Sequence, residues 1–203
     1  MKKLNLIFIL FFTSFGAFSQ VKPIYFIGDN ITTDKNRATS YAVYGKLSDQ
    51  NIWMFKRYDL YDNLLQTGSY HDELLSIPHG KFVFYMDLQE FNYTNKTKYK
   101  LKNKTRFINQ EVNFTDGKED GQWLTFYPDG NLFNVQNYVE GKLEGEYILY
   151  DIYGNFIIKG NYFNEQKHGE WLTEKGTVKE VYDNGVLKST IHLKKTQTPN
   201  SKN

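Results

Sequence analysis

Four histidines and scattered carboxylates are the side chains of this 203-residue chain that could perform acid–base or metal chemistry. His79 and His168 each stand directly before a glycine, His71 lies beside two acidic residues, and His192 is near the C-terminus. Both kinds of chemistry need imidazole and carboxylate groups that converge on one point. Because His79 and His168 occupy equivalent places in a repeated phrase, we interpret them as turn residues, and we expect no catalytic residue, metal site or cofactor.

Sequence motifs of common enzymes give the same expectation. The chain has no cysteine, which removes disulfides, thiolate metal sites and cysteine nucleophiles. The serine-hydrolase elbow, the His-Glu-x-x-His motif, the phosphate-binding loop and the dinucleotide-binding glycine pattern are all missing. We therefore predict a protein that is not an enzyme.

Six cations on strictly alternate residues form the most unusual pattern in the chain. In a strand they would share one face, over roughly 33 Å at about 3.3 Å per residue. One interpretation is an edge strand protected by lysines against aggregation. The other is a surface that binds an anionic partner, such as anionic lipid, lipopolysaccharide or an acidic protein. The six residues are Lys96, Lys98, Lys100, Lys102, Lys104 and Arg106.

Residues 1–19 have the pattern of a cleaved signal peptide. Two lysines precede an apolar stretch too short to span a bilayer, and small residues precede a predicted cleavage between Ser19 and Gln20. Without a cysteine there, a lipoprotein anchor is excluded. We expect an exported bacterial protein, periplasmic or secreted, with no transmembrane segment in its mature chain. Nucleic acid is an unsuitable partner, because the chain is exported and its formal net charge is only +2.

A phrase of ten residues recurs at intervals of 24 and defines the organisation of the chain. Residues 114–123 read FTDGKEDGQW, 138–147 read YVEGKLEGEY, and 162–171 read YFNEQKHGEW. Residues 44–53 and 70–82 are looser copies, the second lengthened by three residues. A fixed period of this kind identifies a repeat architecture. The predicted structural positions are Tyr44, Trp53, Tyr70, Phe82, Phe114, Gly121, Trp123, Tyr138, Gly145, Tyr147, Tyr162, Gly169 and Trp171.

The second glycine of the phrase predicts a special backbone conformation. Asn51 occupies its place in the first copy, and glycine and asparagine are the residues that most readily adopt positive φ. A second turn signal, such as Asp129-Gly130, separates apolar runs between the phrases. We predict that each unit is a strand, a tight turn, a second strand and a longer turn.

These units predict an all-β fold, an elongated twisted antiparallel meander of stacked β-hairpin repeats with a period of about 24. Single hairpins are marginally stable in water, so neighbouring units must pack side by side. The recurring aromatics then form a ladder in the core. The predicted segments are a signal peptide (1–19), an N-terminal strand and loop (20–43), degenerate repeats (44–86), a lysine-alternating insert (87–106), repeats (107–188) and a disordered tail (189–203).

The phrase resembles the MORN repeat, whose core is Tyr-x-Gly-x-x-x-x-Gly-x-aromatic. It is most similar to bacterial MORN-like variants, some of them labelled antitoxin-like, although an export signal fits poorly with neutralising a cytoplasmic toxin. Residues 114–185 match well, residues 44–82 loosely, and residues 87–106 not at all. The resemblance implies β-hairpin repeats and a non-catalytic role as a scaffold, tether or lipid-proximal surface, and it implies no active-site residues.

Three functional hypotheses follow. The first is an exported scaffold that binds an unknown protein or envelope partner. The second is an anionic-surface binder that acts through the cations of residues 96–106. The third is a glycan-binding or glycan-cleaving module, which would use exposed aromatics together with Glu144, Glu146 and Glu170.

Overall fold

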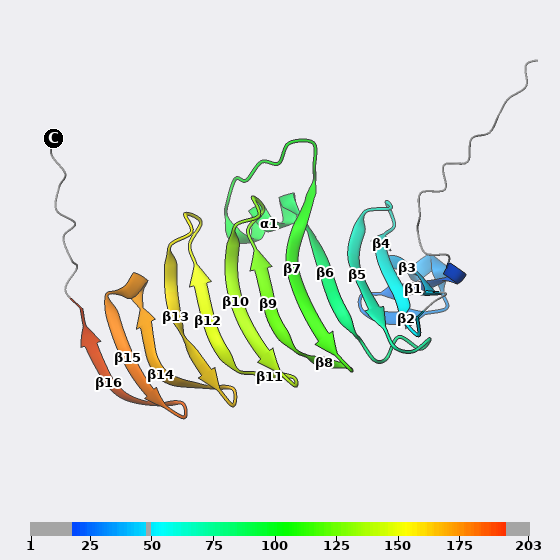
Figure 1. Cartoon of the computed structure of the whole chain (residues 1–203). Helices are drawn as coiled ribbons and strands as arrows, with labels where there is room; N and C mark the ends of the chain where they lie inside the picture. The colour runs from blue at the N-terminus through cyan, green and yellow to red at the C-terminus, as the bar shows by residue number, and fades with distance from the viewer. Residues whose placement is uncertain (1–17, 48–49, 194–203) are drawn as a thin grey trace, which may run out of the picture.

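The computed structural model describes residues 18–47 and 50–193 (Figure 1). The predicted signal peptide therefore lies outside the described residues, apart from the start of β1, and so does the predicted tail from residue 194 onward.

The described chain forms one open antiparallel sheet in which sixteen strands follow each other almost in sequence order. The prediction of an all-β hairpin meander is confirmed. A single helix, α1, and two 3-10 turns, η1 and η2, complete the described residues. The elements are β1 (Phe18–Ile27), β2 (Asn30–Thr32), η1 (Lys35–Arg37), β3 (Ser40–Leu47), β4 (Trp53–Asp59), β5 (Leu64–Tyr70), β6 (Gly80–Asp87), α1 (Leu88–Asn95), β7 (Arg106–Thr115), β8 (Lys118–Glu119), β9 (Gly121–Phe126), β10 (Leu132–Val139), β11 (Lys142–Leu143), β12 (Gly145–Tyr150), β13 (Phe156–Phe163), β14 (Gln166–Thr173), η2 (Glu174–Gly176), β15 (Val178–Asp183) and β16 (Val186–His192).

The turns of the later repeats have the backbone that the glycines predict. Gly121, Gly145 and Gly169 have φ of 90°, 90° and 70°, a region that suits glycine because it has no Cβ. Asn51 is not among the described residues with positive φ, so the prediction is wrong for the first copy. There the chain turns differently, with the Leu47 amide donating to the Ile52 carbonyl at 2.9 Å.

Aromatic side chains of neighbouring strands pack against each other along one face. At the N-terminal end the contacts run from Phe55 to Tyr70, Phe82 and Phe114, with ring centroids 5.7, 5.3 and 5.0 Å apart. At the other end Trp171 contacts three tyrosines. Two of the recurring tryptophans are buried, with Trp53 9% and Trp171 1% exposed. Rings of this kind contribute both buried area and favourable edge-to-face geometry. The rings around Trp171 belong to Tyr147, Tyr162 and Tyr182.

Two strand glycines make room for the largest of these rings. Gly68 on β5 lies beneath Phe82, and Gly160 on β13 lies beneath Trp171. A Cβ at either position would lie within 2.3 Å of the ring above it. Glycine usually weakens a strand. Here it lets an aromatic side chain of the next strand lie flat against the backbone.

The cations of residues 96–104 do not lie on a strand, so the shared strand face that their alternation could have given does not form. Residues 88–95 form α1, residues 96–105 form a loop, and only Arg106 begins a strand. Asp87 explains the helix, because its carboxylate accepts the Gln89 and Glu90 amides at 2.8 and 3.1 Å. An acidic N-cap with a glutamate three residues later is a recognised helix start. Asp87 and Glu90 therefore predict a helix start in the sequence, but the alternating lysines that follow suggest a strand instead.

The prediction of a disordered tail from Ser189 is also wrong for its first residues. β16 continues to His192 and pairs with β15 from Val178 to Asp183. Every side chain of β16 is exposed. Backbone pairing with β15 therefore holds this strand in place, although it buries little.

Candidate functional sites

Two features at opposite ends of β6 and β7 stand out from the repeats. At the end where β6 leads into α1, the insert rises above the sheet (Figure 1). At the other end, the lengthened loop between β5 and β6 lies against the turn that follows β7. Both features depart from the repeat pattern, so neither is needed to continue the sheet.

From Lys96 to Lys102 the exposure of the side chains alternates as the sequence does, although this segment is not a strand. The five lysines of the insert are exposed, whereas Thr97, Tyr99 and Leu101 are half-buried. Tyr99 and Leu101 pack against a cluster of three buried aromatics from α1, β7 and the turn after β9. The lysines must therefore point away from the sheet. The buried aromatics are Phe91, Phe107 and Tyr127.

One asparagine side chain holds the insert in its extended form. Asn92 on α1 donates through Nδ2 to the Tyr99 carbonyl at 2.9 Å and accepts the Tyr99 amide at 2.8 Å. Its Oδ1 also accepts the Thr97 hydroxyl at 2.8 Å. These bonds replace the ladder that a neighbouring strand would provide. The interpretation as a protected edge strand no longer applies, because this segment is not part of the sheet.

Arg106 differs from the five lysines. It is half-buried, and its Nη1 lies 3.6 Å from Asp59 Oδ2 on β4. Burial raises the pKa of Asp59, but hydrogen bonds from Asn63 and Tyr61, together with the charge of Arg106, lower it below its usual value. Arg106 therefore has a structural partner and contributes less to the outward charge than the lysines do.

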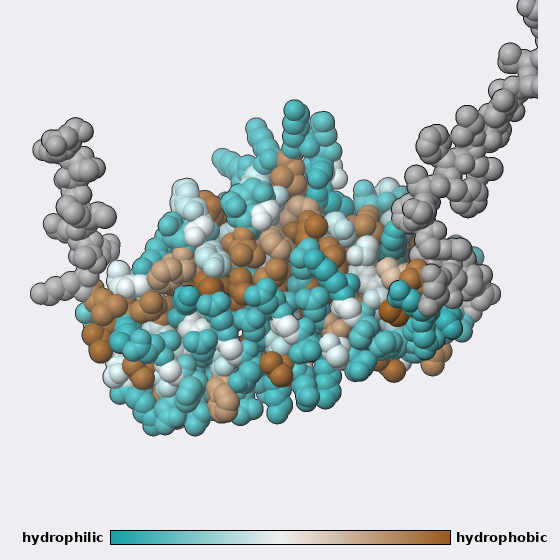
Figure 2. All heavy atoms as spheres, viewed as in Figure 1, coloured by the Kyte–Doolittle hydropathy of each residue, from teal (hydrophilic) through white to brown (hydrophobic). Residues whose placement is uncertain are grey.

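An open groove of about 440 Å³ adjoins the insert. Its lining is mostly apolar, and its charged groups are two cations, Lys104 and Arg106, and two carboxylates, Glu111 and Asp129. On the same part of the molecule Tyr93 of α1 is 89% exposed. Figure 2 shows hydrophilic side chains that project above this end of the sheet, and a hydrophobic band across the strands beneath them. The apolar part of the lining includes Leu101, Phe107, Ile108, Phe126 and Tyr127.

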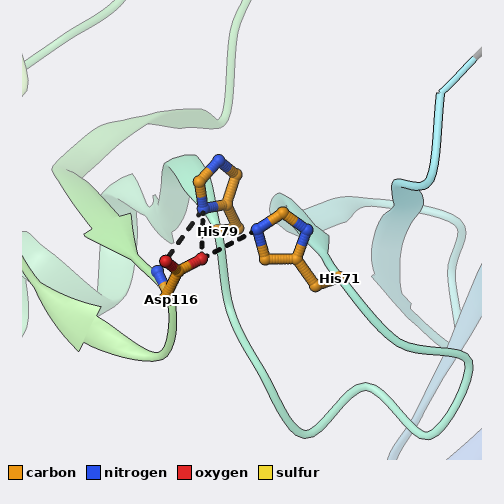
Figure 3. A group of neighbouring side chains, drawn as sticks. All are labelled: His71, His79 and Asp116. Atoms are coloured by element: carbon orange, nitrogen blue, oxygen red, sulfur yellow. Dashed lines mark hydrogen bonds and ion pairs between the residues drawn. The ribbon is translucent and has the colours of Figure 1, made fainter.

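The second feature brings two histidines and a carboxylate together (Figure 3). His71 Nε2 lies 2.9 Å and His79 Nδ1 lies 3.4 Å from Asp116 Oδ1, and the imidazole centroids are 4.0 Å apart. The ligand atoms of all three lie within 4.8 Å of one another. The expectation that no histidines and carboxylate would converge is therefore wrong for His71, His79 and Asp116.

Hydrogen bonds fix the backbone around this cluster. The His71 amide donates to Ile77 at 3.0 Å, and the Gly117 amide donates to Pro78 at 2.8 Å. Asp72 accepts the amides of Ser76 and Ile77 at 2.9 Å each, and the hydrogen bond from the Ser76 side chain lowers the pKa of this carboxyl. Hydrogen bonds within the loop between β5 and β6 thus fix its conformation, and the Gly117 amide bonds it to the turn that carries Asp116.

His168 shows what a histidine at this repeat position does alone. Its Nδ1 accepts the Asn184 amide at 3.4 Å, just as His79 Nδ1 accepts the Asp116 amide at 3.4 Å. His79 lies in the loop just before β6, but His168 lies within β14 opposite Asn161, so the prediction that both are turn residues is wrong for His168. The extra ligand groups come from His71, which the lengthened loop supplies, and from an aspartate in place of Asn184.

The side chains of the glycan hypothesis are largely occupied within the sheet. Trp53 and Trp171 are buried, whereas Trp123 and Tyr147 are half-buried. The three proposed glutamates each have a partner in the fold. Glu144 accepts the Asn164 amide at 2.7 Å, Glu146 pairs with Lys159 at 3.1 Å, and Glu170 pairs with Lys179 at 2.6 Å.

Comparison with family models, with curated proteins and with solved structures finds no match for this chain. In the part of the chain that the structure describes, no helix has the length and apolar character required to cross a bilayer. The class defined by the fold is therefore an open β-hairpin repeat sheet, and the function must be argued from its surfaces.

Proposed function

We propose that this protein is an exported, non-enzymatic MORN-like repeat protein whose insert binds an anionic lipid surface. The observation that carries the proposal is the outward row of lysines on a segment that Asn92 bonds to α1 and that packs on the aromatic cluster through Tyr99 and Leu101. The repeat sheet serves as the scaffold that presents this row. The anionic headgroups of phospholipid or lipopolysaccharide are the chemistry that it suits.

The electrostatics favour an external partner. Among the residues that the structure describes, none of the five lysines of residues 96–104 forms an ion pair, whereas six lysines elsewhere do: Lys81, Lys118, Lys159, Lys175, Lys179 and Lys188. A cation near an anionic membrane contributes about 1 kcal/mol. Five such cations on one loop can therefore supply a useful affinity without any other contact.

The surroundings of the lysines favour lipid over an acidic protein. The groove beside them is mostly apolar, and the exposed ring of Tyr93 projects from the same insert. Tyrosine and lysine together are typical of membrane–water interfaces, where aromatic rings lie at headgroup level. This combination supports shallow contact with a bilayer surface.

Co-sedimentation with vesicles tests the proposal. We expect binding to phosphatidylcholine vesicles that contain phosphatidylglycerol, little binding to phosphatidylcholine alone, and loss of binding as the Debye length falls from about 10 Å at 0.1 M salt to about 3 Å at 1 M. The triple variant Lys98→Glu, Lys100→Glu, Lys102→Glu should bind at least about 100-fold more weakly, because three contributions of about 1 kcal/mol are lost.

A charge-matched control separates the insert from net charge. Lys118, Lys159 and Lys188 are also exposed but pair with carboxylates elsewhere on the sheet. Replacing these three with glutamate changes the net charge by the same amount, and it should leave most of the vesicle binding intact. If both triple variants bind equally, the insert is not the docking surface.

A further inference from the structure

We propose that His71, His79 and Asp116 form a binding site for a divalent transition metal ion, with Zn²⁺ as the ion that fits best. The site is independent of the lipid-binding insert, which lies at the other end of β6 and β7. A bound ion would join the loop between β5 and β6 to the turn between β7 and β8.

The geometry is close to that of a metal centre. Ligands at about 2.1 Å from a tetrahedral ion lie about 3.4 Å from each other. The two nitrogens lie 2.9 and 3.4 Å from the same Asp116 oxygen, and all three ligand atoms point toward one place (Figure 3). Because all three atoms lie within 4.8 Å of one another, no pair is more than about 1.4 Å from the separation that a tetrahedral ion requires.

The donor set selects the ion. Two neutral imidazoles and one carboxylate suit borderline ions such as Zn²⁺, whereas Mg²⁺ and Ca²⁺ prefer oxygen ligands. Three protein ligands leave at least one coordination position for water or for a group of a partner. The side chains of His71 and His79 are 34% and 33% exposed, so an ion can reach the site from solvent.

The cluster gains from an ion because its present contacts are incompletely matched. Nδ1 of His79 accepts the Asp116 amide at 3.4 Å, which is a long and weak hydrogen bond. The same nitrogen, in its accepting form, also faces the Asp116 carboxylate at 3.4 Å. An ion between them would accept a lone pair from each group, and it would replace the 2.9 Å contact between His71 Nε2 and Asp116 Oδ1.

The repeat supplies an internal comparison. His168 occupies the place of His79, and Asn184 that of Asp116, with the same φ of 48° at both turn residues. Among the described residues, His168 belongs to no comparable group of three ligand side chains. The metal-ligand set arises only where the loop is lengthened and the turn carries an aspartate.

Zinc titration calorimetry of the purified full chain without a polyhistidine tag tests the site. We expect one ion per chain, with weaker binding in acid solution, because protons compete with the ion for its ligands. His71→Ala and Asp116→Asn should each lower the affinity at least about 100-fold, since loss of even an outer-shell partner costs 10–100-fold. Asn at position 116 preserves the turn, because Asn184 adopts the same φ.

His168→Ala is the matched control, and it should bind Zn²⁺ as the unchanged protein does. Substitution with Co²⁺ adds a spectroscopic readout, because coordination by His71 and His79 should give visible d–d bands that are absent in Asp116→Asn. Circular dichroism establishes that each variant is folded. Equal binding by Asp116→Asn and the unchanged protein, or equal loss in His168→Ala, would overturn the proposal, as would an absence of binding.

Discussion

Gly160→Ala tests the packing on which the sheet depends. Gly160 has no positive φ, so alanine is compatible with its backbone, and in an open strand it would be favourable by about 0.5–1 kcal/mol. The added Cβ, however, would lie 2.2 Å from Trp171 Cδ2 and 2.4 Å from Cε2. Ordinary carbon contacts are about 3.5–4.0 Å, so either the ring or the strand must move.

The ring has little freedom to move. Trp171 is 1% exposed, packs against Tyr147 and Tyr162 at 5.8 and 5.0 Å, and donates through Nε1 to the Asn161 carbonyl at 3.1 Å. Overpacking a core of this kind costs about 1–3 kcal/mol. Because the ring is confined, we expect Gly160→Ala to lower the free energy of unfolding by about 3 kcal/mol, the upper end of this range. This corresponds to a Tm lower by about 6–12 °C.

Thermal unfolding followed by tryptophan near-ultraviolet circular dichroism measures this shift. The informative control is the same substitution in a Trp171→Leu background, where the steric conflict is gone and alanine should be neutral or slightly stabilising. A Tm that Gly160→Ala leaves unchanged, or an equal loss in both backgrounds, would refute the argument that glycine is required beneath the ring.

Three further predictions concern local contacts. The hydrogen bond from Lys175 lowers the pKa of Asp151 from its usual 3.8 to about 2. The stability that the ionised Asp151 contributes is therefore present above pH 3.8 and is lost as the pH falls toward 2. Lys175→Gln should raise the pKa of Asp151 in an NMR titration. Asn92→Ala should speed amide hydrogen exchange in residues 97–99 and leave the strands protected, and unchanged exchange would contradict its holding role. The hydrogen bond to Asp62 raises the pKa of Tyr41 to about 12, and Asp62→Asn should return its phenolate absorbance transition toward pH 10.

The repeats could be predicted from the sequence because their signals are local and periodic. A period of 24, glycines before aromatics and Asp129-Gly130 together specify hairpins in a fixed order. The insert was harder, because alternating lysines imitate a strand while Asp87 and Glu90 cap a helix. In the structure Phe91 of the helix packs into a cluster with Phe107 and Tyr127, and this packing favours the helix over a strand. Alternation alone reports which side chains face solvent, not which backbone bonds form.

The histidine cluster lay beyond sequence reasoning for a different reason. His79 and Asp116 are 37 residues apart, and they meet because β6 and β7 pair in a register that sets Gly80 opposite Phe114. His71 joins them only because the lengthened loop folds back, with the His79 amide donating to the Ser69 carbonyl at 2.9 Å. Neither the register nor the path of the loop can be obtained from spacing alone.

The strand order also fixes the distance between the insert and the last strand of the sheet. Beyond β7 the sheet continues through β9, β10, β12, β13, β14 and β15 to β16, each bonded to its neighbour. At about 4.8 Å per strand, this separates the insert from the last strand by about 34 Å. Deleting or duplicating one 24-residue unit removes or adds two strands, which would change that distance by about 10 Å and leave both ends intact. The separation between the insert and the C-terminal strand can therefore evolve in steps of one hairpin.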